Sequence, residues 1–230
     1  MKKHILLYFS ITLLTISTQA QAPRGFYAVA GYSQTSIKSS YLVSESKPGF
    51  VAGINFNMGY HENYNFQFEA VYKQNTIAAK YVDNTYLQAK DADLQYSTLE
   101  IGFYTNYYIL KPDEDKFFVG PQAGIFVSFG DNLGASSEDE NGQNYLPYLI
   151  STNSLEDFAK LNYGFGLGLT GGYNKFRFDL RYSLGMANML SNVQTNSYND
   201  NNNYTGPSLS GKTNALTFGV SYLIFARVKK

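Results

Sequence analysis

The sequence has no cysteine, no tryptophan and only two histidines among 230 residues. Without cysteine the chain forms neither disulfides nor thiolate metal sites. Its 18 basic and 18 acidic residues balance, so it lacks the basic excess typical of general nucleic-acid binding. We therefore expect no nucleic-acid partner, no metal and no cofactor.

Long hydrophobic runs are also absent. The apolar stretch at 5–16 is shorter than the roughly 20 residues that a membrane-spanning helix needs. It follows Lys2 and Lys3 and precedes small and polar residues, which is the order of regions in a secretory signal peptide. We predict a signal peptide at 1–20, cleaved after Ala20, and one domain at 21–230. An uncleaved anchor helix is the alternative.

The sequence is instead rich in aromatic residues and in stretches where apolar and polar residues alternate strictly. The chain has 21 tyrosines and 17 phenylalanines, and in "KFRFDLRYSLGMANML" at 175–190 apolar residues alternate with polar ones, which is the period of a β-strand. Most such stretches are long enough for a tilted membrane strand of about 9–11 residues. The eight predicted strands are 25–36, 49–60, 65–77, 93–110, 116–130, 157–172, 175–190 and 213–228.

The connections alternate in length. Short ones at 61–64, 111–115 and 173–174 take turns with long polar ones at 37–48, 78–92, 131–156 and 191–212. Short turns at one end and long loops at the other are typical of bacterial outer-membrane barrels. The sequence thus predicts an all-β fold: an eight-stranded antiparallel up-and-down transmembrane β-barrel, exported to the bacterial outer membrane.

Alternation alone does not say which face meets lipid. A soluble sheet turns its apolar face inward, whereas a membrane barrel turns it outward. Export, long strands and aromatics near strand ends, such as Tyr32, Tyr72, Tyr108, Phe129 and Tyr173, favour the membrane. A soluble periplasmic barrel that holds a lipophilic ligand is the alternative.

With apolar residues facing lipid, several charged residues must face the barrel interior, the lumen. An eight-stranded lumen is only wide enough for side chains to fill it, and unpaired charges there are costly, so we predict ion pairs. Gly164, Gly166 and Gly168 would leave room for the arginines. A gated path for ions or solutes is the alternative. The predicted lumen network is Glu69, Lys73, Glu100, Arg177, Asp179 and Arg181.

Four stretches carry a family resemblance: "LEIGFYTNYYI" at 99–109, "VGPQAGIFVSF" at 119–129, "FGLGLTGGYNKFRFDLRYSLGMANM" at 165–189 and "ALTFGVSYLIF" at 215–225. The chain resembles the PorT-like outer-membrane β-barrel family, small barrels similar in architecture to the OmpA transmembrane domain. This resemblance implies an accessory role in protein secretion or envelope assembly. The chain departs from the family pattern at its end, where "ARVKK" follows the aromatic Phe225.

An enzymatic function is not expected. Barrel hydrolases use histidine in their catalytic groups. Here His4 leaves with the predicted signal peptide, and His61 lies in a predicted short turn without an identifiable serine partner. The acidic residues Glu138, Asp139 and Glu140 do not have the spacing of a calcium loop.

The sequence therefore predicts a structural or interaction role in the cell envelope. Outer-membrane lipid surrounds the barrel, and the external loops contact an envelope protein, a secretion-machinery protein or a surface glycan. Tyr198 and Tyr204 of the Asn-rich loop could supply such contacts. A small-pore porin or transporter is the alternative, although open aqueous channels need around 16 strands.

Overall fold

The computed structural model describes residues 24–59, 63–82, 89–110, 117–135, 144–146, 150–155, 157–195 and 206–226. The predicted signal peptide, both histidines, the acidic residues 138–140, Tyr198 and Tyr204 lie outside these residues. In the described part, no helix is long and apolar enough to cross a membrane.

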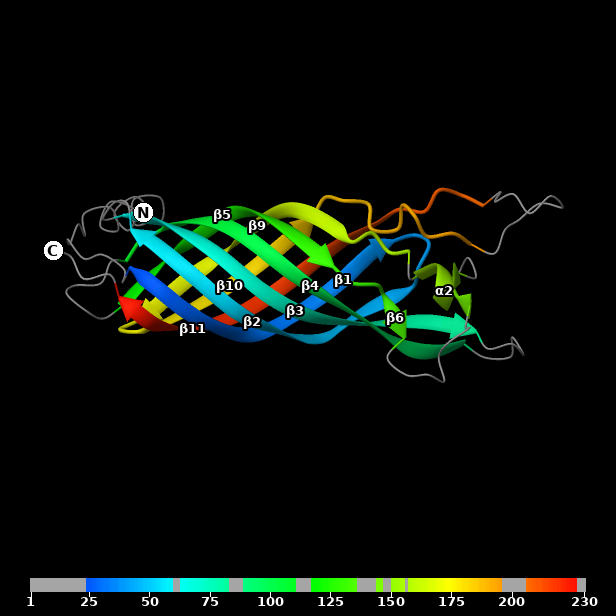
Figure 1. Ribbon diagram of the computed structural model, residues 1–230, viewed down its shortest axis with the longest axis horizontal. Helices are drawn as coiled ribbons and strands as arrows, with labels where there is room; N and C mark the ends of the chain where they lie inside the picture. The colour runs from blue at the N-terminus through cyan, green and yellow to red at the C-terminus, as the bar shows by residue number, and fades with distance from the viewer. Residues whose placement is uncertain are drawn as a thin grey trace, which may run out of the picture.

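Eight long strands within the described residues form a closed antiparallel barrel (Figure 1). Each strand pairs with the next long strand along the chain, and β11 pairs with β1 to close the ring. The strands are β1 (Gly25–Ser39), β2 (Ser44–Gly59), β3 (Tyr64–Val82), β4 (Ala89–Tyr107), β5 (Phe117–Gly130), β9 (Leu161–Tyr173), β10 (Phe176–Gly185) and β11 (Gly211–Ala226). The predicted eight-stranded up-and-down barrel is confirmed.

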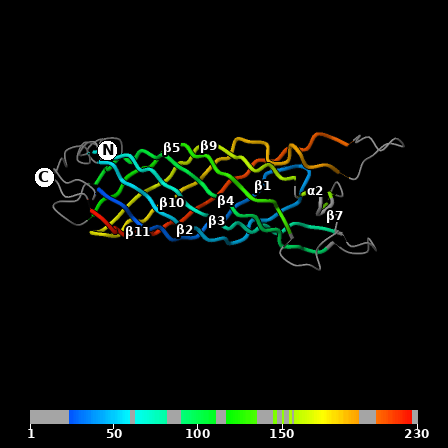
Figure 2. Tube along the Cα trace, viewed as in Figure 1, coloured from blue at the N-terminus to red at the C-terminus, as the bar shows by residue number. Residues whose placement is uncertain are grey.

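The two ends of the barrel differ. Gly25 at the start of β1 pairs with Ala226 at the end of β11, and the short β9–β10 connection lies at this same end, here called the turn end. The two longest connections, between β5 and β9 and between β10 and β11, run at the opposite end, here called the loop end, and Figure 2 shows their described parts there. There β1 to β4 extend well beyond β5, β9 and β10 (Figure 1).

The alternation along each strand separates two faces. In β10, exposed and buried residues alternate at every position from Phe176 to Gly185. The exposed set is apolar, and the buried set contains both arginines and Asp179. The face that a soluble protein would bury is therefore on the outside, which is the arrangement of a barrel surrounded by lipid.

Near the loop end the inward face of the long strands changes from polar to apolar. On β3 the inward side chains Glu69, Lys73 and Asn75 are polar, but Ile77 and Ala79 further along the same face are apolar and fully buried. The exposed ion pairs Lys47–Asp93 and Lys80–Asp91 lie at these ends, which indicates that the outer ends of these strands extend beyond the lipid into water.

The apolar side chains on the inward face of these strand ends build a second core, here called the cap. It combines residues of β1, β3 and β4 with the chain between β5 and β9 and between β10 and β11. Short elements brace it: β6 (Gly134–Ala135) pairs with β4, β7 (Asn144–Tyr145) with β3 and β8 (Ile150–Ser151) with β7, followed by α2 (Thr152–Leu155). The cap core contains Ile37, Leu42, Ile77, Leu94, Tyr96, Leu133, Tyr145, Ile150, Leu155, Phe158, Leu190, Val193 and Leu209.

Several predicted boundaries are wrong because of the cap. The long polar connection predicted at 37–48 shrinks to 40–43, since the polar residues on either side lie on strands that stand in water. The strand predicted at 157–172 begins at Leu161, and the strand predicted at 175–190 ends at Gly185. Phe158, Met189 and Leu190, assigned to those strands by their hydrophobicity, pack into the cap instead.

Candidate functional site

The lumen holds all six charged residues named from the sequence. Each is 5% exposed or less, and together they form three ion pairs. From the turn end toward the loop end the pairs are Arg177–Asp179, Arg181–Glu69 and Lys73–Glu100. Here they are called the lumen network.

Arg181 spans the lumen from β10 to β3. Its Nη1 donates to Glu69 Oε1 at 2.7 Å, and its Nε donates to Gln122 Oε1 on β5 at 2.8 Å. The guanidinium carbon also lies 3.6 Å from the centre of the Tyr104 ring on β4. One side chain therefore joins four strands around the barrel.

Space for Arg181 comes from a glycine on the neighbouring strand. A Cβ atom at Gly166 would lie 2.8 Å from Tyr104 Cε1 and 3.0 Å from Arg181 Cδ. Gly164, Gly166 and Gly168 all lie on the inner face of β9, as the alternation predicts. The glycine at 166 is thus needed for close packing of the arginine and the tyrosine.

Arg177 holds the layer nearest the turn end. Its Nε donates to both carboxylate oxygens of Asp179 at 3.1 Å, its Nη1 donates to Asn57 Oδ1 at 2.7 Å, and its Nη2 donates to Gln67 Oε1. The side chain is 1% exposed, so every one of these contacts is made away from bulk water. Such hydrogen bonding is what makes a buried charge tolerable.

Amides that the sequence-based prediction did not name connect the ion pairs. Gln122 Nε2 donates to Asn106 Oδ1 at 2.7 Å and to Gln67 Oε1 at 3.1 Å, and Gln67 Nε2 donates to Glu69 Oε2 at 2.9 Å. The alternation in the sequence could have identified these amides, because it places them on the inward face. They went unnamed because uncharged amides do not stand out in a search for charge pairs.

The turn end of the lumen is closed by aromatic rings. Tyr108 and Phe118 are each 3% exposed and pack edge to face, with their centroids 5.2 Å apart. Tyr108 lies near a predicted strand end, where the sequence predicts aromatic residues that face lipid, and for Tyr108 that prediction is wrong. It follows β4 and turns inward.

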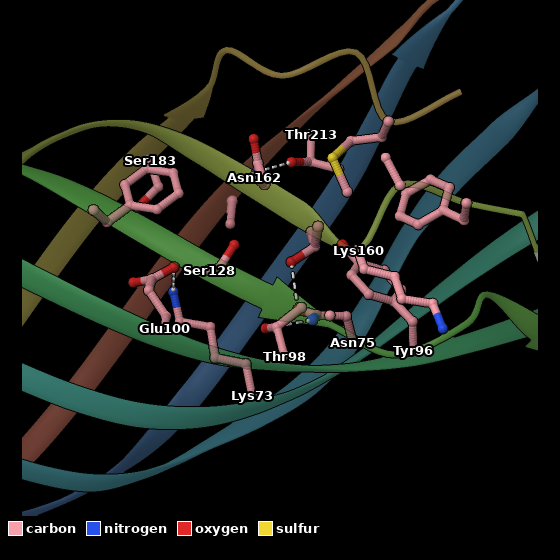
Figure 3. Close-up of a pocket in the computed structure, with 17 residues that line it drawn as sticks. Lys73, Asn75, Tyr96, Thr98, Glu100, Ser128, Lys160, Asn162, Ser183 and Thr213 are labelled. Atoms are coloured by element: carbon pink, nitrogen blue, oxygen red, sulfur yellow. Dashed lines mark hydrogen bonds and ion pairs between the residues drawn. The ribbon is translucent and has the colours of Figure 1, made fainter. Parts of the chain in front are cut away.

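Between the lumen network and the cap lies a polar cavity of about 40 Å³ (Figure 3). Lys73 Nζ and Glu100 Oε2 meet at 2.7 Å on its wall. Asn162 donates to Thr213 across another side at 2.8 Å. Glu100 Oε1 and Ser183 Oγ are buried without a hydrogen-bond partner. By volume the cavity has room for about three waters, which would satisfy these two oxygens.

The described residues contain no group of three or more histidine, aspartate or glutamate side chains placed to hold a metal ion. The charged lumen residues are engaged with one another, so the arrangement serves to fill the barrel.

The outer wall carries aromatic residues at both ends of an apolar band. Near the turn end, Phe117, Tyr173, Phe176 and Tyr222 form one paired row across four strands. On β9 the band runs from Tyr163 to Tyr173, both more than half exposed. Ten residues of a strand tilted by about 40° span roughly 25 Å, the height expected of a membrane barrel's apolar band. The fold is a transmembrane β-barrel.

No family model and no curated protein matches the chain. Among solved structures it is similar to the outer membrane protein OprG from Pseudomonas aeruginosa, with 11% identity over 90% of this chain and 98% of that one and a TM-score of 0.48. It is also similar to Ail, the attachment invasion locus protein of Yersinia pestis, with 12% identity, coverage of 86% and 98%, and a TM-score of 0.40. The N-terminal β-barrel domain of Pseudomonas aeruginosa OprF gives 9% identity, coverage of 87% and 100%, and a TM-score of 0.32. At these values the similarities assign no function, and the fold rests on the strand pairing described above.

Proposed function

We propose that this protein is an integral outer-membrane barrel with a structural or interaction role in the cell envelope. The observation that carries the proposal is the combination of a lipid-compatible wall with a filled lumen. Leu180 and Phe178 face outward from the same strand whose arginines are tied across the interior. A wall of this kind belongs in a bilayer, and an interior of this kind does not conduct.

The loop end supports an interaction role. Its strands extend beyond the apolar band, and the cap gives them a packed core, so the loop end presents a folded surface outside the membrane. Folded surfaces hold contact residues in place at a lower entropic cost than mobile loops do. In the narrower form suggested by the PorT-like resemblance, this surface engages a component of a secretion or surface-assembly machine.

Two measurements test the proposal. Fractionation should recover the protein in the outer membrane, resistant to extraction with carbonate. Co-purification in mild detergent, with an affinity tag inserted within 196–205, should recover a stoichiometric envelope protein. Recovery in the soluble fraction would refute the membrane location, and a monomer without a partner would refute the interaction role.

Conductance distinguishes this function from that of a small-pore porin. The refolded protein in a planar bilayer is expected to give no reproducible single-channel current, because Arg177, Arg181 and their partners fill the cross-section. A steady, ion-selective current from the unmodified chain would favour the porin instead.

A further inference from the structure

The outer wall has two hollows that lie end to end over β5 and β9. The first is an apolar groove of about 630 Å³ on the lipid-facing side. Ile101 and Val127 are paired across β4 and β5 and are only partly exposed, whereas Tyr163 and Phe165 on β9 are 56% and 54% exposed. This stretch therefore offers an apolar chain contacts on several sides.

The second hollow is a polar crevice of about 540 Å³ beside the start of β9. Asn132, Asp157, Lys160 and Asn192 line it, together with Leu161, an exposed apolar residue on the outer face of β9. It therefore combines amide groups and two charges of opposite sign with an apolar border.

The groove and the crevice are neighbours along β9. Leu161 lines the crevice and Tyr163 lines the groove, and both lie on the outer face of the strand. Two strand residues span about 6.6 Å, so the two hollows adjoin. Because Tyr163 marks the loop-end border of the apolar band, the groove lies in the hydrocarbon layer and the crevice lies at headgroup level.

The charges of the crevice are available to a ligand. Asp157 and Lys160 are both exposed, and neither forms an ion pair with another described residue. A lysine complements a phosphate, and an aspartate complements an ammonium group. An amphiphile that carries both groups above an acyl chain matches the two hollows together.

We propose that the wall over β5 and β9 binds one zwitterionic phospholipid of the loop-side leaflet, with an acyl chain in the groove and its phosphate and ammonium groups at Lys160 and Asp157. The inference rests on the proposed membrane location and adds a specific lipid site to it.

The acyl part is tested by native mass spectrometry of the full chain in detergent with equal amounts of phosphatidylethanolamine and phosphatidylglycerol. Retention of one phosphatidylethanolamine is expected. Val127→Trp fills the groove with another apolar side chain and should lower the bound fraction by about fivefold or more. Val220→Trp is the matched control, because Val220 faces lipid on β11 outside the groove and is also partly exposed. Equal retention by the two variants would overturn the proposal.

The headgroup part is tested with charge variants. Lys160→Gln should weaken the binding of both lipids by about fivefold. Asp157→Asn should remove the preference for phosphatidylethanolamine over phosphatidylglycerol. Lys212→Gln, also exposed but outside the crevice, is the control. Unchanged binding in the Lys160 and Asp157 variants would overturn the headgroup assignment. A barrel that inserts into vesicles yet retains no phospholipid refutes the site alone, whereas failure to insert refutes the membrane location.

Discussion

Arg181 and Glu69 are 112 residues apart in the chain and meet inside the barrel, where the arginine Nη1 lies 2.7 Å from the glutamate Oε1. The pair joins β10 to β3, two strands that are not neighbours in the sheet. It can form only in the closed barrel, so it couples ring closure to the satisfaction of a buried charge.

Replacing one partner of this pair should lower the free energy of unfolding more than replacing both. Glu69→Gln leaves the Arg181 charge buried and without its counter-charge, and we expect a loss of about 3–5 kcal/mol in the free energy of unfolding. Glu69→Gln combined with Arg181→Met should lose less than that. Urea unfolding of the protein in lipid vesicles measures both, and a double variant that loses as much stability as Glu69→Gln alone would contradict the coupling.

Gly166 should tolerate no side chain. Gly166→Ala places a methyl group against the Tyr104 ring and the Arg181 stem, with an expected loss of about 1–3 kcal/mol in unfolding free energy. Gly219→Ala is the control, because there the nearest atom to an added Cβ is Val29 Cγ1 at 3.8 Å. Equal unfolding midpoints for the two variants would show that the lumen packing is looser than described.

The position of the bilayer can be tested on one face of β10. Leu180→Arg puts a charge near mid-membrane and should destabilise the barrel by about 2–4 kcal/mol. Leu184→Arg, four residues nearer the loop end on the same outward face, should cost only about 0–1 kcal/mol. Folding titrations in vesicles measure the difference. A larger penalty at Leu184 would move the apolar band toward the loop end.

The cap should open without loss of the barrel. Phe158 is 2% exposed and packs beside Tyr96, so Phe158→Ala removes cap packing worth about 3–5 kcal/mol. We expect faster proteolysis of the chain between β5 and β9, with an unchanged electrophoretic shift of the folded barrel. Phe165→Ala, which faces lipid, should leave the proteolysis rate unchanged. Loss of the folded band in Phe158→Ala would show that cap and barrel fold as one unit.

The barrel was predictable because strand alternation and connection length are local properties. Arg177, Asp179 and Arg181 could be assigned to one face from their spacing in the sequence, and that face is the buried one. Their partners were harder to identify, since Gln67, Gln122 and Asn57 come from three other strands whose relative register is set only when the sheet forms.

The cap was not predictable by the same rule. Ile77 continues the inward set of β3 to which Gln67, Glu69 and Lys73 belong, so one alternation runs from a polar interior into an apolar one. The sequence-based prediction assumes that apolar residues face outward along the whole strand. Beyond the bilayer the apolar residues face inward instead. The stretches at 37–48 and 131–156 therefore resembled solvated loops, although they contribute Ile37, Leu133 and Ile150 to a core.

The location of the cap has a consequence for assembly. In the outer-membrane location proposed above, its apolar core forms only after the outer ends of β1, β3 and β4 have crossed the bilayer to the far side. The free energy released by that hydrophobic burial is then available only to a chain that has completed its passage. Withdrawal would require the core to be dismantled and its apolar side chains exposed to water. The cap thus makes insertion directional, and it opposes the return of a strand once that strand has crossed.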